Sequence, residues 1–92
     1  MPTNRVSSKD RLLAMNSDLK VVFGEVLKEL RIKRELTQQQ LADYSGMDRA
    51  YISELERGLL LPSLETVFKL AKQLKIKPRE MVELVDQRIS IS

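Results

Sequence analysis

The chain has 92 residues, enough for one small domain, and its 42% hydrophobic and 32% charged composition is typical of a soluble globular protein. It contains no cysteine and no histidine, which excludes disulfides, thiolate metal sites, cysteine nucleophiles and a Ser-His-Asp triad. No apolar run approaches the roughly 20 residues of a membrane helix. We therefore expect a cytoplasmic protein that is not an enzyme, lies in no membrane and uses no metal or cofactor.

The charge is mildly basic and unevenly distributed. Sixteen Lys and Arg against thirteen Asp and Glu give a net charge of +3. Residues 1–36 carry +3, residues 37–61 carry −2 and residues 62–92 carry +2. A polyanion such as DNA would therefore be held largely by the two flanking segments.

The N-terminal part of the chain divides into an arm and a helix. Residues 1–17 are polar, so we expect a flexible arm with at most a loose helical turn or two. From Leu19 the apolar residues recur at helical spacing, which predicts a first helix that ends near Leu36. The folded domain is expected to span residues 18–86, and residues 87–92 would form a C-terminal tail.

Two short helices separated by a glycine follow. Thr37 and the glutamine three residues later form a T-x-x-Q capping box, which predicts a helix start. Gly46 stands where that helix would end in a left-handed residue, and Asp48 is expected to cap the next helix. Residues 37–57 therefore have the organisation of a helix-turn-helix.

Two further helices complete the expected fold. Ser63 is expected to cap a fourth helix, and Pro78 stands at the first position of a fifth. The inward stripe of the fourth helix would comprise Leu64, Val67, Leu70, Ala71 and Leu74. The sequence predicts an all-α domain of five short helices around one core.

The segment TQQQLADYSGMDRAYISELERG, followed by PSLETVFKLAKQL, resembles the lambda-repressor-like DNA-binding domain of the Xre/Cro repressor family. The run MDRAYISELERG is also similar to the controller proteins of restriction–modification systems. The resemblance implies a five-helix lambda-repressor-like fold. Its recognition helix, at Asp48–Arg57, would lie in the major groove of DNA.

The resemblance also implies which side chains meet DNA. Arg49 has the planar fork that binds guanine O6 and N7, and Ala50 can touch a thymine methyl group. Glu54 would accept from cytosine N4 or merely keep phosphates at a distance. Gln38 matches the family's position for holding a phosphate, beside the amides of a helix N-terminus. The predicted contact set is Thr37, Gln38, Gln39, Arg49, Ala50, Tyr51, Ser53, Glu54 and Arg57.

Several of these residues have a structural alternative. Tyr51 can instead pack its ring on a neighbouring helix, Gln39 can be helix filler, and Arg49 can be a solvated surface arginine. Arg31 and Glu56 match a pair that forms an internal salt bridge in the family, so we expect them to be structural.

The loop Leu59–Leu61 departs from the family pattern, which usually has polar or basic residues there. Three leucines in a row are not expected all to turn inward, so part of the loop is expected to contact a second subunit or another protein. The predicted dimer interface comprises Leu60, Met81, Val82, Val85 and Ile89.

These features together predict a sequence-specific transcriptional regulator that binds double-stranded DNA. It would act as an autoregulating repressor, a homodimer on a palindromic operator with half-sites about one helical turn apart. The alternative is an antitoxin or other interaction module that binds a partner protein and binds DNA only secondarily. The leucine loop and the N-terminal arm favour that alternative.

Overall fold

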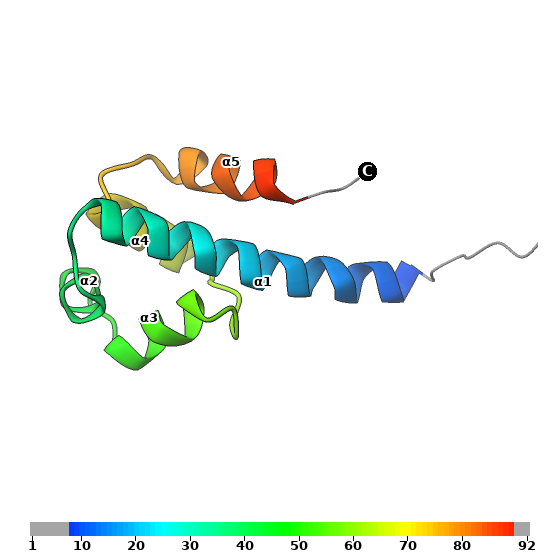
Figure 1. Ribbon diagram of the computed structural model, residues 1–92, viewed down its shortest axis with the longest axis horizontal. Coiled ribbons are helices and arrows are strands. Elements are labelled where there is room, and N and C mark those ends of the chain that lie inside the picture. Colours follow the sequence, from blue (N-terminus) through cyan, green and yellow to red (C-terminus); the bar gives the residue numbers. More distant parts are fainter. Residues whose placement is uncertain (1–7, 90–92) are drawn as a thin grey trace, which may run out of the picture.

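The computed structural model describes residues 8–89, which form five helices and no strand. The helices are α1 (Ser8–Lys33), α2 (Gln38–Ser45), α3 (Arg49–Glu56), α4 (Leu64–Gln73) and α5 (Pro78–Arg88). The long α1 runs through the middle of the molecule, with α3 packed on one side and α5 on the other (Figure 1). The predicted all-α, five-helix fold is confirmed.

One apolar core joins all five helices. Each helix contributes side chains with almost no exposed surface, so their removal from water stabilises the whole arrangement. The buried hydrophobic residues are Phe23, Val26, Leu27, Leu41, Ala42, Ile52, Leu55, Val67, Leu70, Ala71, Leu74, Met81 and Val85.

The first helix differs from the prediction at both ends. It begins at Ser8, so residues 8–17 are helical rather than part of an arm, whereas residues 1–7 lie outside the described residues. Residues 8–17 contain no glycine or proline, and such a segment can extend a helix even though it is polar. The helix ends at Lys33, before the predicted Leu36, because Glu35 adopts a left-handed conformation with φ 58°.

Two further boundaries follow from local chemistry. Ser63 caps α4 as predicted, since its Oγ accepts a hydrogen bond from the Thr66 backbone N–H at 3.0 Å. Pro78 is the first residue of α5, also as predicted. That helix continues to Arg88, two residues past the expected division between residues 86 and 87.

Two residues predicted at the dimer surface are buried in the core of the single chain. Met81 has no exposed surface and Val85 is only 7% exposed. They lie four residues apart on one face of α5, and that face packs on the core. Val82 points away from it and is 53% exposed, while Ile89 is partly buried against the core. Of the four residues predicted on α5 and at its end, Val82 is therefore the one that presents a large apolar surface.

Leu64 also departs from the prediction, because it is 71% exposed instead of facing inward. It is the first residue of α4, and the buried stripe of that helix begins two residues later, with Thr66 and Val67. None of the helices in the described part of the chain is long and apolar enough to span a membrane.

Candidate nucleic-acid interface

The helix-turn-helix is formed by α2, α3 and the tight turn between them. Gly46 ends α2 with φ 69°, a left-handed conformation that glycine adopts without steric cost. The next residue, Met47, donates its backbone N–H to the Ala42 oxygen at 2.8 Å, which fixes the turn. Ala42 and Ile52 have no exposed surface, so both helices are anchored in the core. The predicted helix-turn-helix is confirmed.

The N-terminus of α2 presents unpaired backbone donors. Thr37 Oγ1 accepts from the Gln40 N–H at 3.0 Å, and Gln40 Oε1 accepts from the Thr37 N–H at 2.9 Å. This capping box leaves the first-turn amides of Gln38 and Gln39 without an intrahelical acceptor. The Gln39 side chain lies along the helix and donates to Asp43 at 2.9 Å. An anion placed at this helix end would therefore meet oriented N–H groups.

The outer face of α3 holds most of the predicted base-reading residues. Arg49 and Ala50 in its first turn are exposed, as is Arg57 just after its end. Ser53 and Glu54 are partly exposed. Asp48 occupies the N-cap position with an extended backbone, but its side chain makes no capping hydrogen bond. This face combines two arginines with one carboxylate, a set that can hydrogen-bond to base edges in a major groove.

Tyr51 packs inward, in the position that the sequence analysis gave as its structural alternative. Its side chain is half-buried against the core, and its hydroxyl lies 3.3 Å from Thr66 Oγ1 on α4. The Ser63 hydroxyl donates to the same Thr66 oxygen at 3.0 Å. The structure therefore shows the packing alternative for Tyr51, whose ring and hydroxyl attach α3 to α4.

The predicted salt bridge between Arg31 and Glu56 is confirmed and has an additional member. Arg31 Nε lies 2.6 Å from Glu56 Oε2, and Arg31 Nη2 donates to Glu56 Oε1 at 3.0 Å. The Glu56 side chain is only 3% exposed, and the hydrogen bonds that it accepts raise the pKa of Arg31. Gln38 Nε2 donates to the same Glu56 Oε1 at 3.0 Å. The expected phosphate-binding side chain is thus engaged within the protein, where it connects α2 to α3.

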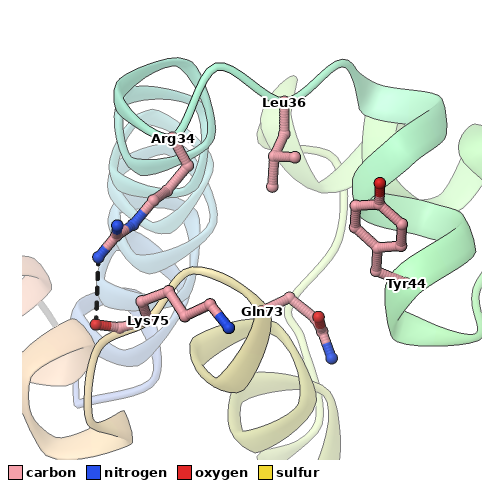
Figure 2. A pocket seen from close by; sticks show the side chains of 5 residues that line it. All are labelled: Arg34, Leu36, Tyr44, Gln73 and Lys75. Atoms are coloured by element: carbon pink, nitrogen blue, oxygen red, sulfur yellow. Dashed lines mark hydrogen bonds between the residues drawn. The ribbon is translucent and has the colours of Figure 1, made fainter.

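A shallow hollow of about 330 Å³ lies between the C-terminal ends of α1 and α4, beside α2 (Figure 2). Arg34 crosses one side of it, donating from Nε to the Leu74 oxygen at 2.9 Å and from Nη2 to the Lys75 oxygen at 3.4 Å. These bonds satisfy carbonyl groups that α4 leaves free at its end. Arg34, the residue after the end of α1, therefore caps the C-terminal end of α4.

The leucine loop divides between core and solvent. Leu60 is partly buried against the core, whereas Leu59 is 51% exposed and Leu61 is 43% exposed. The prediction that not all three turn inward is confirmed, and Leu60, the leucine predicted at the dimer interface, is the one that packs against the core. Leu61 instead lines an apolar groove of about 170 Å³ together with Val82.

Sequence reasoning missed one residue that positions the interface. Gly24 of α1 is buried against the end of α3, where a β-carbon would lie 2.5 Å from the Leu55 backbone oxygen. This close contact sets the distance between α1 and α3, the predicted recognition helix. The single signal in the sequence is a glycine inside an otherwise regular helical pattern.

Comparison with known proteins agrees with this geometry. A family profile described as helix-turn-helix matches residues 27–81, which include all of α2, α3 and α4. The chain belongs to the lambda-repressor-like helix-turn-helix family. It is thus a DNA-binding transcription regulator of the Xre type, and its family is not one of enzymes.

Several relatives share this domain. The control protein C.BamHI of Bacillus amyloliquefaciens is 30% identical over 70 residues, which cover 75% of this helix-turn-helix chain and 86% of the relative. The transcriptional repressor RghR of Bacillus subtilis is 51% identical over 55 residues, which cover 59% of this chain but only 41% of RghR. The crystal structure of the restriction-modification controller protein C.AhdI of Aeromonas hydrophila matches with a TM-score of 0.66 and 48% identity. That match covers 70% of this chain and 96% of C.AhdI.

Proposed function

We propose that this helix-turn-helix regulator is an autoregulating repressor that binds a palindromic operator as a homodimer, with each α3 reading one half-site. The observation that carries the proposal is the division of α3 into two faces. Ile52 and Leu55 are fully buried, whereas Arg49 and Ala50 are exposed at the N-terminal end of the same helix. A helix that packs on the core along one face and exposes the side chains of its first turn is suited to enter a major groove.

Base reading would depend chiefly on the first turn of α3. Arg49 is assigned to a guanine and Ala50 to a thymine methyl group, while Glu54, one turn later, would accept from a cytosine amino group. Gln39 and Ser53 are assigned to phosphate contacts at the edges of this face. Arg57 follows α3 and is exposed, so its charge can reach the DNA backbone.

The N-terminus of α2 would hold one phosphate. Its capping box presents the amides of Gln38 and Gln39 outward, and the positive end of the helix dipole adds to the attraction. The Gln38 side chain already donates to Glu56, so we assign the phosphate contact to its backbone N–H and to the hydroxyl of Thr37.

The dimer surface is assigned to the groove that Leu61 and Val82 share. Both side chains are exposed, and the other residues that line the groove are also apolar. A second copy would remove this surface from water. Repression would then depend on protein concentration, because the dimer must form before both half-sites are occupied.

The test is selection of binding duplexes from a random pool, followed by titration of the best duplex at two salt concentrations. We expect a two-fold symmetric site bound about 10³-fold or more tightly than random DNA. Arg49→Ala should weaken that site by about 1–3 kcal/mol and relax one base position, while the exposed Arg79→Ala on α5 serves as a control. Equal losses with Arg49→Ala on every sequence would contradict the guanine assignment.

A protein-partner module is the second candidate, and the exposure of Leu59 and Leu61 favours it. In that case the selection would yield no enriched sequence and only weak binding that salt abolishes. Autoregulation is tested separately, by measuring whether the protein represses a reporter carrying its own upstream region.

A further inference from the structure

A second apolar groove, which the helix-turn-helix does not use, lies between α1 and α5. It has a volume of about 150 Å³ and is lined by Met15, Leu19, Val82, Val85, Asp86 and Ile89. It adjoins the groove of Leu61, since Leu19, Val82 and Val85 line both. The two grooves therefore form one apolar channel along α1 and α5.

One end of this channel lies against the N-terminal half of α1, where Met15 and Leu19 line it. With 26 residues, α1 is about 39 Å long, and the first turns of its N-terminal half project beyond the other helices (Figure 1). Met15 lies on this projecting half and is 40% exposed. Met15 thus places a partly exposed apolar side chain at the edge of the groove, beside the C-terminal end of α5.

Charges of opposite sign flank the two parts of this surface. Lys9 and Arg11 are exposed on the projecting half of α1, and Glu83 and Asp86 are exposed on α5. None of these four side chains has an ion-pair partner within the part of the chain that the structure describes. Arg11 precedes Met15 by one helical turn, about 6 Å, whereas Asp86 lies at the rim of the groove that Met15 lines.

We propose that the groove receives the projecting half of α1 from a second copy of this chain, with the two α1 helices antiparallel across a two-fold axis. Met15 of each copy enters the groove of the other. Arg11, one turn away, then reaches the second copy's Asp86, and symmetry makes the same pair twice. This proposal rests on the homodimer of the proposed function and specifies which segment completes it.

The arrangement is compatible with DNA binding. The groove lies between α1 and α5. Figure 1 shows α3 on the opposite side of α1 from α5. A second copy seated in the groove therefore leaves the outer face of α3 open.

The experiment measures the dimer dissociation constant by sedimentation equilibrium without DNA. Arg11→Glu and Asp86→Arg each place like charges together at two symmetric positions, so each should weaken the dimer about 5–30-fold. The double variant restores opposite charges and should recover most of the wild-type affinity. Met15→Asp should weaken the dimer more than either charge reversal, and Arg79→Glu, on α5 but outside the groove, should leave it unchanged.

Each outcome bears on a separate claim. If the single variants dimerise like the wild type, or if the double variant is no better than the singles, the α1 exchange is wrong although the homodimer stands. If the wild type remains monomeric at high concentration, both the exchange and the homodimer of the proposed function are wrong. Arg11 and Asp86 are exposed, so circular dichroism should show unchanged folding in these variants.

Discussion

Gly24 offers a sharp test of how α1 supports the recognition helix. A β-carbon at this position would lie 2.5 Å from the Leu55 oxygen and 2.7 Å from the Glu56 oxygen, whereas ordinary contact begins at 3.4 Å. Gly24→Ala therefore requires α1 and α3 to separate by about 0.9 Å, the difference between 3.4 and 2.5 Å. Both oxygens belong to the backbone, so no flexible side chain can absorb the shift.

The expected sign of the change follows from two opposing effects. Alanine in place of glycine inside a helix is ordinarily stabilising, by about 0.5–1 kcal/mol. Overpacking at a close-packed helix contact costs about 1–3 kcal/mol, and a gap of nearly 1 Å weakens the contacts of Ile52 and Leu55 as well. We expect a net loss of about 1–2 kcal/mol, which for a domain of this size lowers Tm by about 4–15 °C.

Urea unfolding followed by circular dichroism measures this loss as a lower midpoint at unchanged slope. Lys28→Ala, at an exposed position on the same helix, is the control and should change stability by less than about 0.5 kcal/mol. Operator affinity should fall with Gly24→Ala even where the protein is fully folded, because α3 is displaced. A variant as stable as the wild type or more so would refute the close approach of α1 to α3.

Three other predictions concern the contacts that hold the helices together. Arg31→Met leaves the carboxylate of Glu56 buried without its cation and should cost about 3–5 kcal/mol in urea unfolding; a loss below about 1 kcal/mol would contradict the buried pair. Lys75→Gly should stabilise by about 0.5–1 kcal/mol, because Lys75 has φ 61° and glycine adopts that conformation freely; unchanged or lower stability would argue against this strain. The hydrogen bond from Arg88 Nη2, 3.0 Å from Glu29 Oε1, lowers the pKa of Glu29 from 4.5. The stabilisation that this ion pair gives to the fold is therefore complete at pH values above the ordinary pKa of a glutamate. It is lost as the pH falls through the lowered pKa of Glu29. Glu29→Gln should remove this part of the decrease in unfolding free energy at acid pH. If the unfolding free energy of the variant and the wild type depended on pH in the same way, the Arg88–Glu29 pair would not contribute to stability.

The sequence predicts best where structure is decided by neighbouring residues. The ends of α2 were predictable because the Thr37 capping box and the left-handed Gly46 act through their own backbone. The start of α1 was not, since its first turns are polar and carry no amphipathic signal. The orientations of Tyr51 and Leu60 were also not predictable, because they depend on where other helices and the core lie.

The same distinction holds for the candidate site. Arg49 and Ala50 are where helical periodicity places them, since the buried residues Ile52 and Leu55 fix the inward face of α3. The Gln38 bond to Glu56 joins residues 18 apart in sequence, and no local pattern reports it. On α5, periodicity allows either Val82 or its neighbour Met81 to face inward, and only packing selects Met81 for the core.

The recognition helix is fastened at three places: by Glu56 to α1 and α2, by Tyr51 to Thr66 of α4, and by the close contact at Gly24. A reading element held this firmly has little freedom to adjust to a duplex of imperfect shape. In the proposed homodimer, the elastic work of fitting two half-sites would then fall on the DNA. Base pairs between the half-sites should therefore influence affinity through their stiffness, although no side chain touches them.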